Sequence, residues 1–124
     1  MFKINEDLSI HVTRGDAVNF TVNAHTEEGY YTFRVGDLVR FKVFGKKSTE
    51  NVYLTKEVRV EEETQEVMIH LDNEDTTIGD FINKPTDYWY EVELNPDIQP
   101  QTIIGYDEDG AKVFRLYPEG GDLE

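Results

Sequence analysis

The sequence predicts an all-β protein, because short segments of alternating apolar and polar residues recur along it, with turn residues between them. The clearest segment is 88–94, in which every second residue from Tyr88 to Leu94 is apolar or aromatic and the intervening positions include two glutamates. Asn95-Pro96 ends this segment, since proline has no amide hydrogen to donate to a neighbouring strand. Turn signals spaced about 8–12 residues apart, almost without helical periodicity, are typical of two packed sheets. We therefore expect a two-sheet β-sandwich, immunoglobulin-like or jelly-roll-like, of about eight antiparallel strands.

The first half of the chain contains four candidate strands. They are expected at 8–13, 17–24, 30–33 and 38–44. Arg14-Gly15-Asp16 separates the first two and matches a known integrin-attachment tripeptide, but Gly-Asp is also ordinary turn chemistry at a point where a hairpin needs a turn. We interpret it as a turn.

The second half continues the pattern. Strands are expected at 52–60, 67–71, 88–94, 101–106 and 112–117. The last two flank Asp107-Glu108-Asp109-Gly110, which predicts a hairpin with Gly110 at positive φ. The exception to the β-pattern is one short helical turn near 72–82, which Asp72 is placed to cap.

Alternation also assigns one face of each strand to the core. The residues assigned in this way are Ile10, Val12, Val18, Phe20, Val22, Val39, Phe41, Val43, Val67, Ile69, Leu71, Tyr90, Val92 and Leu94. No repeat or linker divides the chain, so residues 1–124 are expected to form a single β-sandwich domain.

Composition narrows the class of protein. Hydrophobic residues make up 38% of the chain and aromatic residues 12%, which is too apolar for a disordered acidic tail. The absence of cysteine excludes disulfides and thiolate metal sites, and fits synthesis in a reducing cytoplasm. Neither a secretory signal nor a membrane-spanning run is visible, so we expect no membrane association.

The net charge of −14 is unevenly distributed. Residues 1–60 carry nine Lys/Arg and eight Asp/Glu, whereas residues 61–124 carry three and eighteen, which gives +1 and −15. Nucleic-acid binding requires clusters of basic residues, so this distribution argues against it. The acidic half favours solubility, a basic protein partner, or mimicry of DNA.

No catalytic, cofactor or metal site is predicted. No nucleophile has a base at a recognisable spacing, and no glycine-rich phosphate loop occurs. His11, His25 and His70 lie far apart in the sequence and are expected at the surface. The carboxylates near Asp72 and Asp107 lack the EF-hand pattern, and a loosely held calcium ion at either loop stays an open alternative.

A possible interaction surface is predicted from strand parity. Arg40 and Lys42 share the face opposite the core, and on the segment 88–94 the corresponding face carries Trp89, Glu91 and Glu93. The basic pair is expected to face the acidic strands of a neighbouring copy. The predicted surface consists of Arg40, Lys42, Trp89, Glu91, Glu93 and Tyr106.

Five segments together carry a resemblance, and they are Ile10–Asp16, Phe20–Val22, Asp37–Val43, Asp87–Leu94 and Gln101–Asp107. They resemble small proteins and N-terminal domains of tailed bacteriophages and prophages of Firmicutes. The layout is similar to the N-terminal domain of phage baseplate upper proteins, and head-fibre proteins are the second family that it resembles. The resemblance covers most of the chain and implies a docking module that joins a fibre or receptor-binding part to the particle. Because the chain stops at Glu124, we expect a stand-alone decoration or adaptor protein.

These observations favour a non-enzymatic virion accessory protein, made in the bacterial host cytoplasm, that docks on other virion structural proteins and forms a homo-oligomer. Two other functions stay open. One is an acidic inhibitor that mimics DNA in the groove of a host protein. The other is a carbohydrate-binding module, which would need Trp89 or Tyr106 exposed in a groove.

Overall fold

The regular elements of the protein are all β-strands in the residues that the computed structural model describes, which are 2–45, 52–79, 84–105 and 110–119. The strands are β1 (Phe2–Ile4), β2 (Ile10–Thr13), β3 (Val18–Val22), β4 (His25–Thr26), β5 (Gly29–Tyr30), β6 (Leu38–Phe44), β7 (Val52–Arg59), β8 (Val67–Leu71), β9 (Thr86–Leu94), β10 (Gln101–Ile104) and β11 (Lys112–Tyr117). The predicted all-β class is confirmed. Those ranges contain no helix long and apolar enough to cross a membrane.

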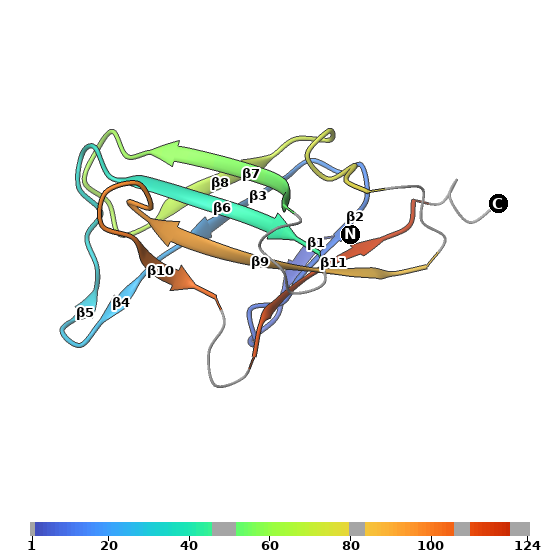
Figure 1. Ribbon diagram of the computed structural model, residues 1–124, viewed down its shortest axis with the longest axis horizontal. Coiled ribbons are helices and arrows are strands. Elements are labelled where there is room, and N and C mark those ends of the chain that lie inside the picture. Colours follow the sequence, from blue (N-terminus) through green and yellow to red (C-terminus); the bar gives the residue numbers. More distant parts are fainter. Residues whose placement is uncertain (1, 46–51, 80–83, 106–109, 120–124) are drawn as a thin grey trace.

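Seven strands form the main sheet in the order β1-β2-β11-β9-β6-β7, with β10 also paired to β9 (Figure 1). All neighbours are antiparallel except β2 and β11, which run parallel with Ile10 opposite Phe114. The expectation of about eight antiparallel strands was therefore wrong, since the described residues alone form eleven strands with one parallel pair. The additional strands have two or three residues, too few to show a period in the sequence.

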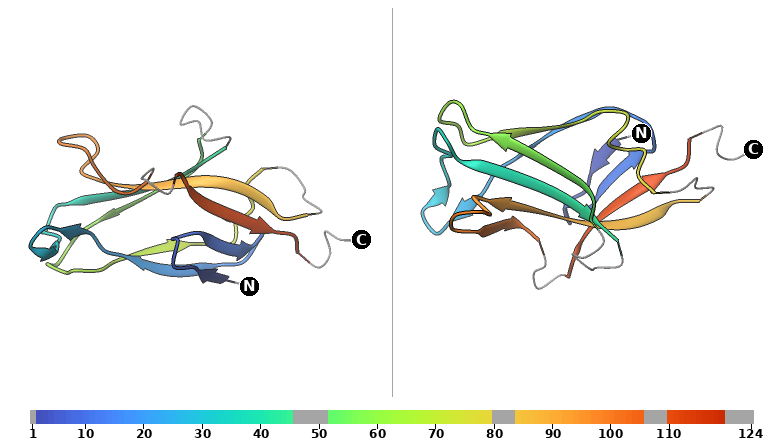
Figure 2. Two further views of the ribbon diagram at one scale, coloured as in Figure 1. Left: turned by 90° about the horizontal axis from the view of Figure 1, so that it is seen from below. Right: turned by 45° about the horizontal axis from the view of Figure 1, so that its top comes forward.

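A ribbon of β3 and β8 lies against one face of the main sheet (Figure 2). The ring of Phe20 on β3 meets that of Phe41 on β6, with centroids 5.4 Å apart. Phe41 also contacts Tyr90 on β9 at 5.5 Å and Phe114 on β11 at 6.3 Å, so one side chain joins four strands. All fourteen residues assigned to the core from the sequence are buried, with no more than 7% of their surface exposed.

The predicted hairpin between the last two strands was wrong. β10 pairs with the end of β9, from Val92 to Leu94, and β11 pairs with its beginning, from Thr86 to Tyr90. Both follow one edge of β9, because β9 has nine residues and is long enough for two short strands in succession. The hairpin that forms is β9–β10, whose turn contains Asn95 at a φ of 48°. Gly110 has the predicted positive φ, 98°, whereas residues 106–109 lie outside the described residues.

The predicted helical turn is also not a helix. Over the described part, 72–79, the chain forms hydrogen-bonded turns, and residues 80–82 of that prediction lie outside the described residues. Asp72 does cap the turn as expected: its Oδ1 accepts from the amide of Asp75 at 3.0 Å, and Asp75 Oδ2 accepts from the amide of Asp72 at 2.9 Å. Asp75 also pairs with Lys56 of β7 at 2.8 Å, which ties this turn to the edge of the main sheet.

Candidate functional site

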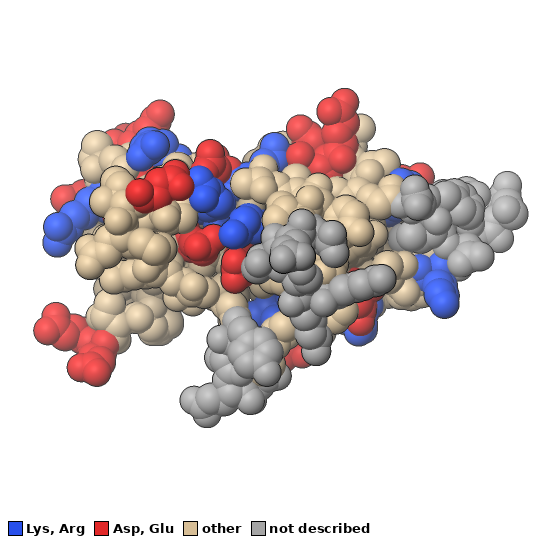
Figure 3. All heavy atoms as spheres, viewed as in Figure 1, with Lys and Arg blue, Asp and Glu red and all other residues tan. Residues whose placement is uncertain are grey.

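The predicted basic residues lie on the outer face of the main sheet, within a row of cross-strand ion pairs (Figure 3). Arg40 lies between β7 and β9, and its Nη2 is 2.6 Å from Glu57 Oε2 and 3.0 Å from Asp97 Oδ2. The hydrogen bond that Arg40 donates to Glu57 is the main reason that the pKa of Arg40 is raised, although burial opposes the charged form. Arg40 is therefore neutralised within its own chain.

Lys42 is held in the same way by the two predicted glutamates. Its Nζ lies 2.9 Å from Glu93 Oε1 and 3.4 Å from Glu91 Oε1. Burial opposes the charge on Lys42, but the hydrogen bonds and charges of the two carboxylates outweigh it and raise the pKa of Lys42. The structure thus brings Arg40, Lys42, Glu91 and Glu93 together on one face, and it satisfies their charges without a neighbouring copy.

The aromatic candidates do not form a platform among the described residues. Trp89 is half-buried on the outer face of β9, opposite Phe44 and Val113, as the strand parity predicted. Tyr106 lies outside the described residues. Tyr90 is buried as expected, and its hydroxyl donates to the carbonyl of Leu8 at 2.5 Å.

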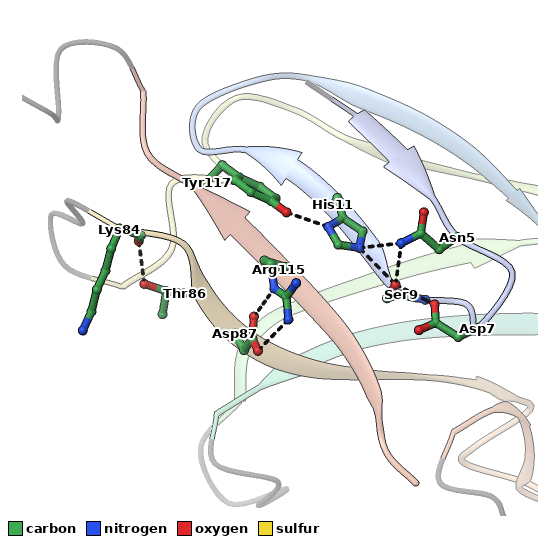
Figure 4. A network of polar contacts seen from close by, with 9 residues as sticks. All are labelled: Asn5, Asp7, Ser9, His11, Lys84, Thr86, Asp87, Arg115 and Tyr117. Atoms are coloured by element: carbon green, nitrogen blue, oxygen red, sulfur yellow. Dashed lines mark hydrogen bonds and ion pairs between the residues drawn. The ribbon is translucent and has the colours of Figure 1, made fainter. Parts of the chain in front are cut away.

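His11 was predicted at the surface, and this prediction was wrong, because only 5% of its surface is exposed. Figure 4 shows its ring among the side chains of Asn5, Ser9 and Tyr117. Its strand, β2, is paired on both sides, and the turn before β2 supplies polar partners. Nε2 is 3.0 Å from both Ser9 Oγ and Asn5 Nδ2, and Nδ1 is 2.9 Å from the hydroxyl of Tyr117. Because the amide nitrogen Nδ2 of Asn5 can only donate, Nε2 accepts, and we assign the proton of His11 to Nδ1, which donates to the hydroxyl of Tyr117.

This network has the residue types of a nucleophile and a base, but not their arrangement. The Ser9 hydroxyl donates its hydrogen bond to Asp7 at 2.6 Å, whereas acyl transfer by a serine needs the hydroxyl to donate to the base. Only 7% of Ser9 is exposed, which leaves little space for a substrate beside it. Burial, and then the charges of Arg115 and Lys3, lower the pKa of His11 and keep it neutral. We interpret the network as a structural link between the N-terminal turn and β11.

A different surface has the features of a binding site. At the end of the molecule that holds the β4–β5 hairpin, four hollows follow one another. The first, of about 500 Å³, lies between the end of β7 and the start of β8, and it shares Glu66 with a second of about 180 Å³. The second shares Tyr30 with a third of about 550 Å³. The third shares Tyr31 and Arg34 with a fourth of about 300 Å³ beside the β9–β10 turn.

The four most exposed large hydrophobic side chains of the described residues gather at this same end. They are Ile98, Val35, Met68 and Tyr30, which are 84%, 67%, 60% and 54% exposed. Met68 and Ile98 each line one of the hollows, Tyr30 lines two, and Val35 follows Arg34 in the chain. Grouped apolar exposure is uncommon on a monomer surface and marks sites of interaction.

Carboxylates line three of the four hollows, all except the one beside Ile98. The hollows are lined by five exposed glutamates, which are Glu28, Glu61, Glu62, Glu63 and Glu66. Figure 3 shows acidic side chains at the tip of the β4–β5 hairpin, on the left. Two arginines line the same hollows, so the lining has a formal charge of −3. We call this surface the acidic end, defined by Tyr30, Val35, Met68, Ile98 and the five glutamates.

The acidic end was not predicted from the sequence, because residues 61–64 only fall between the strands expected at 52–60 and 67–71. The signals were present: three successive glutamates between those strands, and two apolar residues, Val35 and Ile98, inside polar turn segments. What the sequence alone could not supply is that these loops meet at one end of the sheet.

Comparisons with known proteins add no family. No protein-family model matches the sequence, and no curated protein matches it. Within the described residues, no group of three or more histidine or carboxylate side chains is placed to hold a metal ion.

Proposed function

We propose that this protein is a non-enzymatic docking module that binds another protein through its acidic end. The observation that carries the proposal is the gathering of the four most exposed large hydrophobic side chains at an end that is hollowed and lined by carboxylates. Hollows that are open and partly apolar suit the side chains of a partner.

The proposed partner is another structural protein of a tailed-phage particle. Support comes from the resemblance of segments such as Ile10–Asp16 and Asp87–Leu94 to phage docking domains, and from the β-rich fold. In this proposal the protein is made in the host cytoplasm and becomes part of the virion. Self-association belongs to the same proposal, but not through Arg40 and Lys42, whose charges are compensated within the chain.

We further propose that the two layers form an immunoglobulin-like sandwich. In that fold, strands C, F and G share one sheet and strands B and E share the other. Here β6, β9 and β11 lie together in the main sheet, and β3 pairs with β8 in the ribbon that packs on it. Such a scaffold presents its loops at its two ends, and the acidic end is built from loops of this kind.

The two alternatives receive less support. A DNA mimic needs an ordered row of unpaired negative charge, and on the sheet face the carboxylates of Glu57, Glu91 and Glu93 are paired with basic side chains. At the acidic end the glutamates share their hollows with exposed apolar side chains such as Met68 and Tyr30, which a row of phosphates does not resemble. A sugar platform on Trp89 needs an exposed ring, whereas Trp89 is half-buried.

Quantitative mass spectrometry of purified particles of the phage or prophage that encodes the chain tests this function. We expect the protein at a fixed copy number relative to the major capsid or baseplate proteins. Its absence from particles that assemble while it is expressed would refute the virion assignment. Co-purification instead with a host nucleic-acid-binding protein would favour the DNA mimic.

A further inference from the structure

Given the proposed docking function, on which this inference rests, we infer that the acidic end binds an extended segment of its partner in which basic residues flank spaced apolar residues. Shape, charge and apolar exposure at the described residues each point to that occupant.

The shape favours an extended chain. The four hollows are linked by shared residues, from Glu66 through Tyr30 to Tyr31 and Arg34, so they form a path from the β7–β8 connection to the β9–β10 turn. An extended segment places successive side chains in successive hollows. The Lys56–Asp75 ion pair joins β7 to the turn after β8 and so holds these elements together away from the β7–β8 connection. The first hollow lies between the same two strands at the other end, which is the acidic end.

Strand edges border the start of that path. Within the described residues, β7 pairs only with β6, and β8 pairs only with β3. The first hollow is lined by residues of both edges, including Val58 of β7 and Met68 of β8. An extended segment can add to such an edge through main-chain hydrogen bonds, while its side chains fill the adjoining hollows.

The charge favours a basic segment. None of the five glutamates that line the hollows forms an ion pair within the described residues, in contrast to the paired glutamates of the sheet face. Arg59 lines the first hollow, but its Nη1 donates to the carbonyl of Gly36 at 2.9 Å and it forms no ion pair with these glutamates among the described residues. The carboxylates therefore remain for lysine or arginine side chains of the partner, and the net charge of −14 also accelerates encounter with a basic partner.

The exposed apolar residues favour a peptide over a saccharide. Met68, Val35 and Ile98 are aliphatic and offer no flat ring on which a sugar can stack, but they suit aliphatic side chains. Tyr30 is the aromatic member of the four, and His25 packs against its ring with centroids 4.3 Å apart, so the ring is not an open platform for a sugar. The exposed part of the ring and the Glu28 carboxylate line the same hollow, where an arginine or lysine can contact both.

Fluorescence anisotropy with three short synthetic peptides tests the inference. The first alternates lysine, threonine and leucine, and in the other two glutamate or serine replaces every lysine. We expect the lysine peptide to bind at least about tenfold more tightly than the serine peptide, with affinity falling as salt is raised. The double variant Glu62→Lys with Glu66→Lys should lose about tenfold or more of that affinity, and Met68→Ser should also weaken it.

The control variant is Glu74→Lys, an exposed glutamate in the turn after β8, which should leave the affinity within about twofold. Equal loss in the control would mean that net charge alone attracts the peptide, and this would overturn the site. Equal binding of all three peptides, or displacement by chito- or cello-oligosaccharides, would overturn the basic-segment inference. The docking function fails separately, if particle mass spectrometry finds no copies of the protein.

Discussion

Replacement of Phe41 by alanine should remove the contact that joins both layers of the fold. Phe41 is fully buried on β6, and its ring meets Phe20, Tyr90 and Phe114 with centroids 5.4, 5.5 and 6.3 Å away. Phe→Ala changes in cores cost about 3–5 kcal/mol. Three aromatic partners, each adding about 0.5–1.5 kcal/mol beyond buried area, place this variant in the upper half of that range, at about 4–5 kcal/mol. This is a large part of the roughly 5–15 kcal/mol that stabilises a typical domain.

Urea unfolding, followed by far-UV circular dichroism and by the fluorescence of the single tryptophan, measures this loss. The matched control is Phe2→Ala on the edge strand β1, where the ring is 38% exposed and contacts Phe20 at 6.4 Å. We expect the control to lose no more than about 1 kcal/mol. If the two variants unfold at the same urea concentration, Phe41 is not the centre of the core and the described packing of β3 on the main sheet is wrong.

Three further predictions follow from local geometry. Gly79→Ala should destabilise the fold more than Gly110→Ala. Both glycines have a positive φ, but only the methyl group added at Gly79 would overlap another group, the Tyr88 hydroxyl. The urea midpoints of the two variants measure the difference. Because the pKa of His11 is lowered in the folded protein, the unfolded state binds a proton first as pH falls below about 6.5. The stability of the fold should therefore decrease from that pH down to the lowered pKa. His11→Gln should remove this decrease in thermal melts between about pH 7.5 and 5.5. Lys42→Ala should cost about 1–2 kcal/mol, since it leaves two half-buried carboxylates side by side, and added salt should reduce the loss measured in thermal melts.

The core was predictable because each strand carries its own signal. In segments such as Val18–Val22 and Val67–Leu71, the alternation of apolar and polar residues alone indicates that every second residue is buried. The structure pairs these two segments, with their apolar side chains on the same side. Some strand ends, such as Phe44 before Gly45 and Leu94 before Asn95-Pro96, and the turn at Arg14-Gly15 were predictable for the same reason, since proline and glycine act on their own backbone. Others were not: the strand expected at 30–33 is Gly29–Tyr30 in the structure.

Pairing between distant strands was not predictable. The sequences of β10 and β11 each fit a hairpin, and only the length of the free edge of β9 decides that both pair with β9 instead. His11 shows the same limit: its parity indicates solvent, but Tyr117, 106 residues away, supplies the partner that allows its burial. The acidic end likewise depends on three loops that meet only in the folded chain, so composition indicated an acidic half but not a surface.

Site-specific photo-crosslinking in purified particles tests most directly whether the acidic end is the docking surface. A benzophenone amino acid is placed at Met68, in the first hollow, or at Thr55, an exposed position on the charged sheet face of β7. We predict a cross-link from position 68 to a virion protein, within a segment rich in lysine or arginine, and little or none from position 55. Cross-linking from position 55 but not from position 68 would contradict docking through the acidic end. It would indicate instead that the sheet face is the interaction surface.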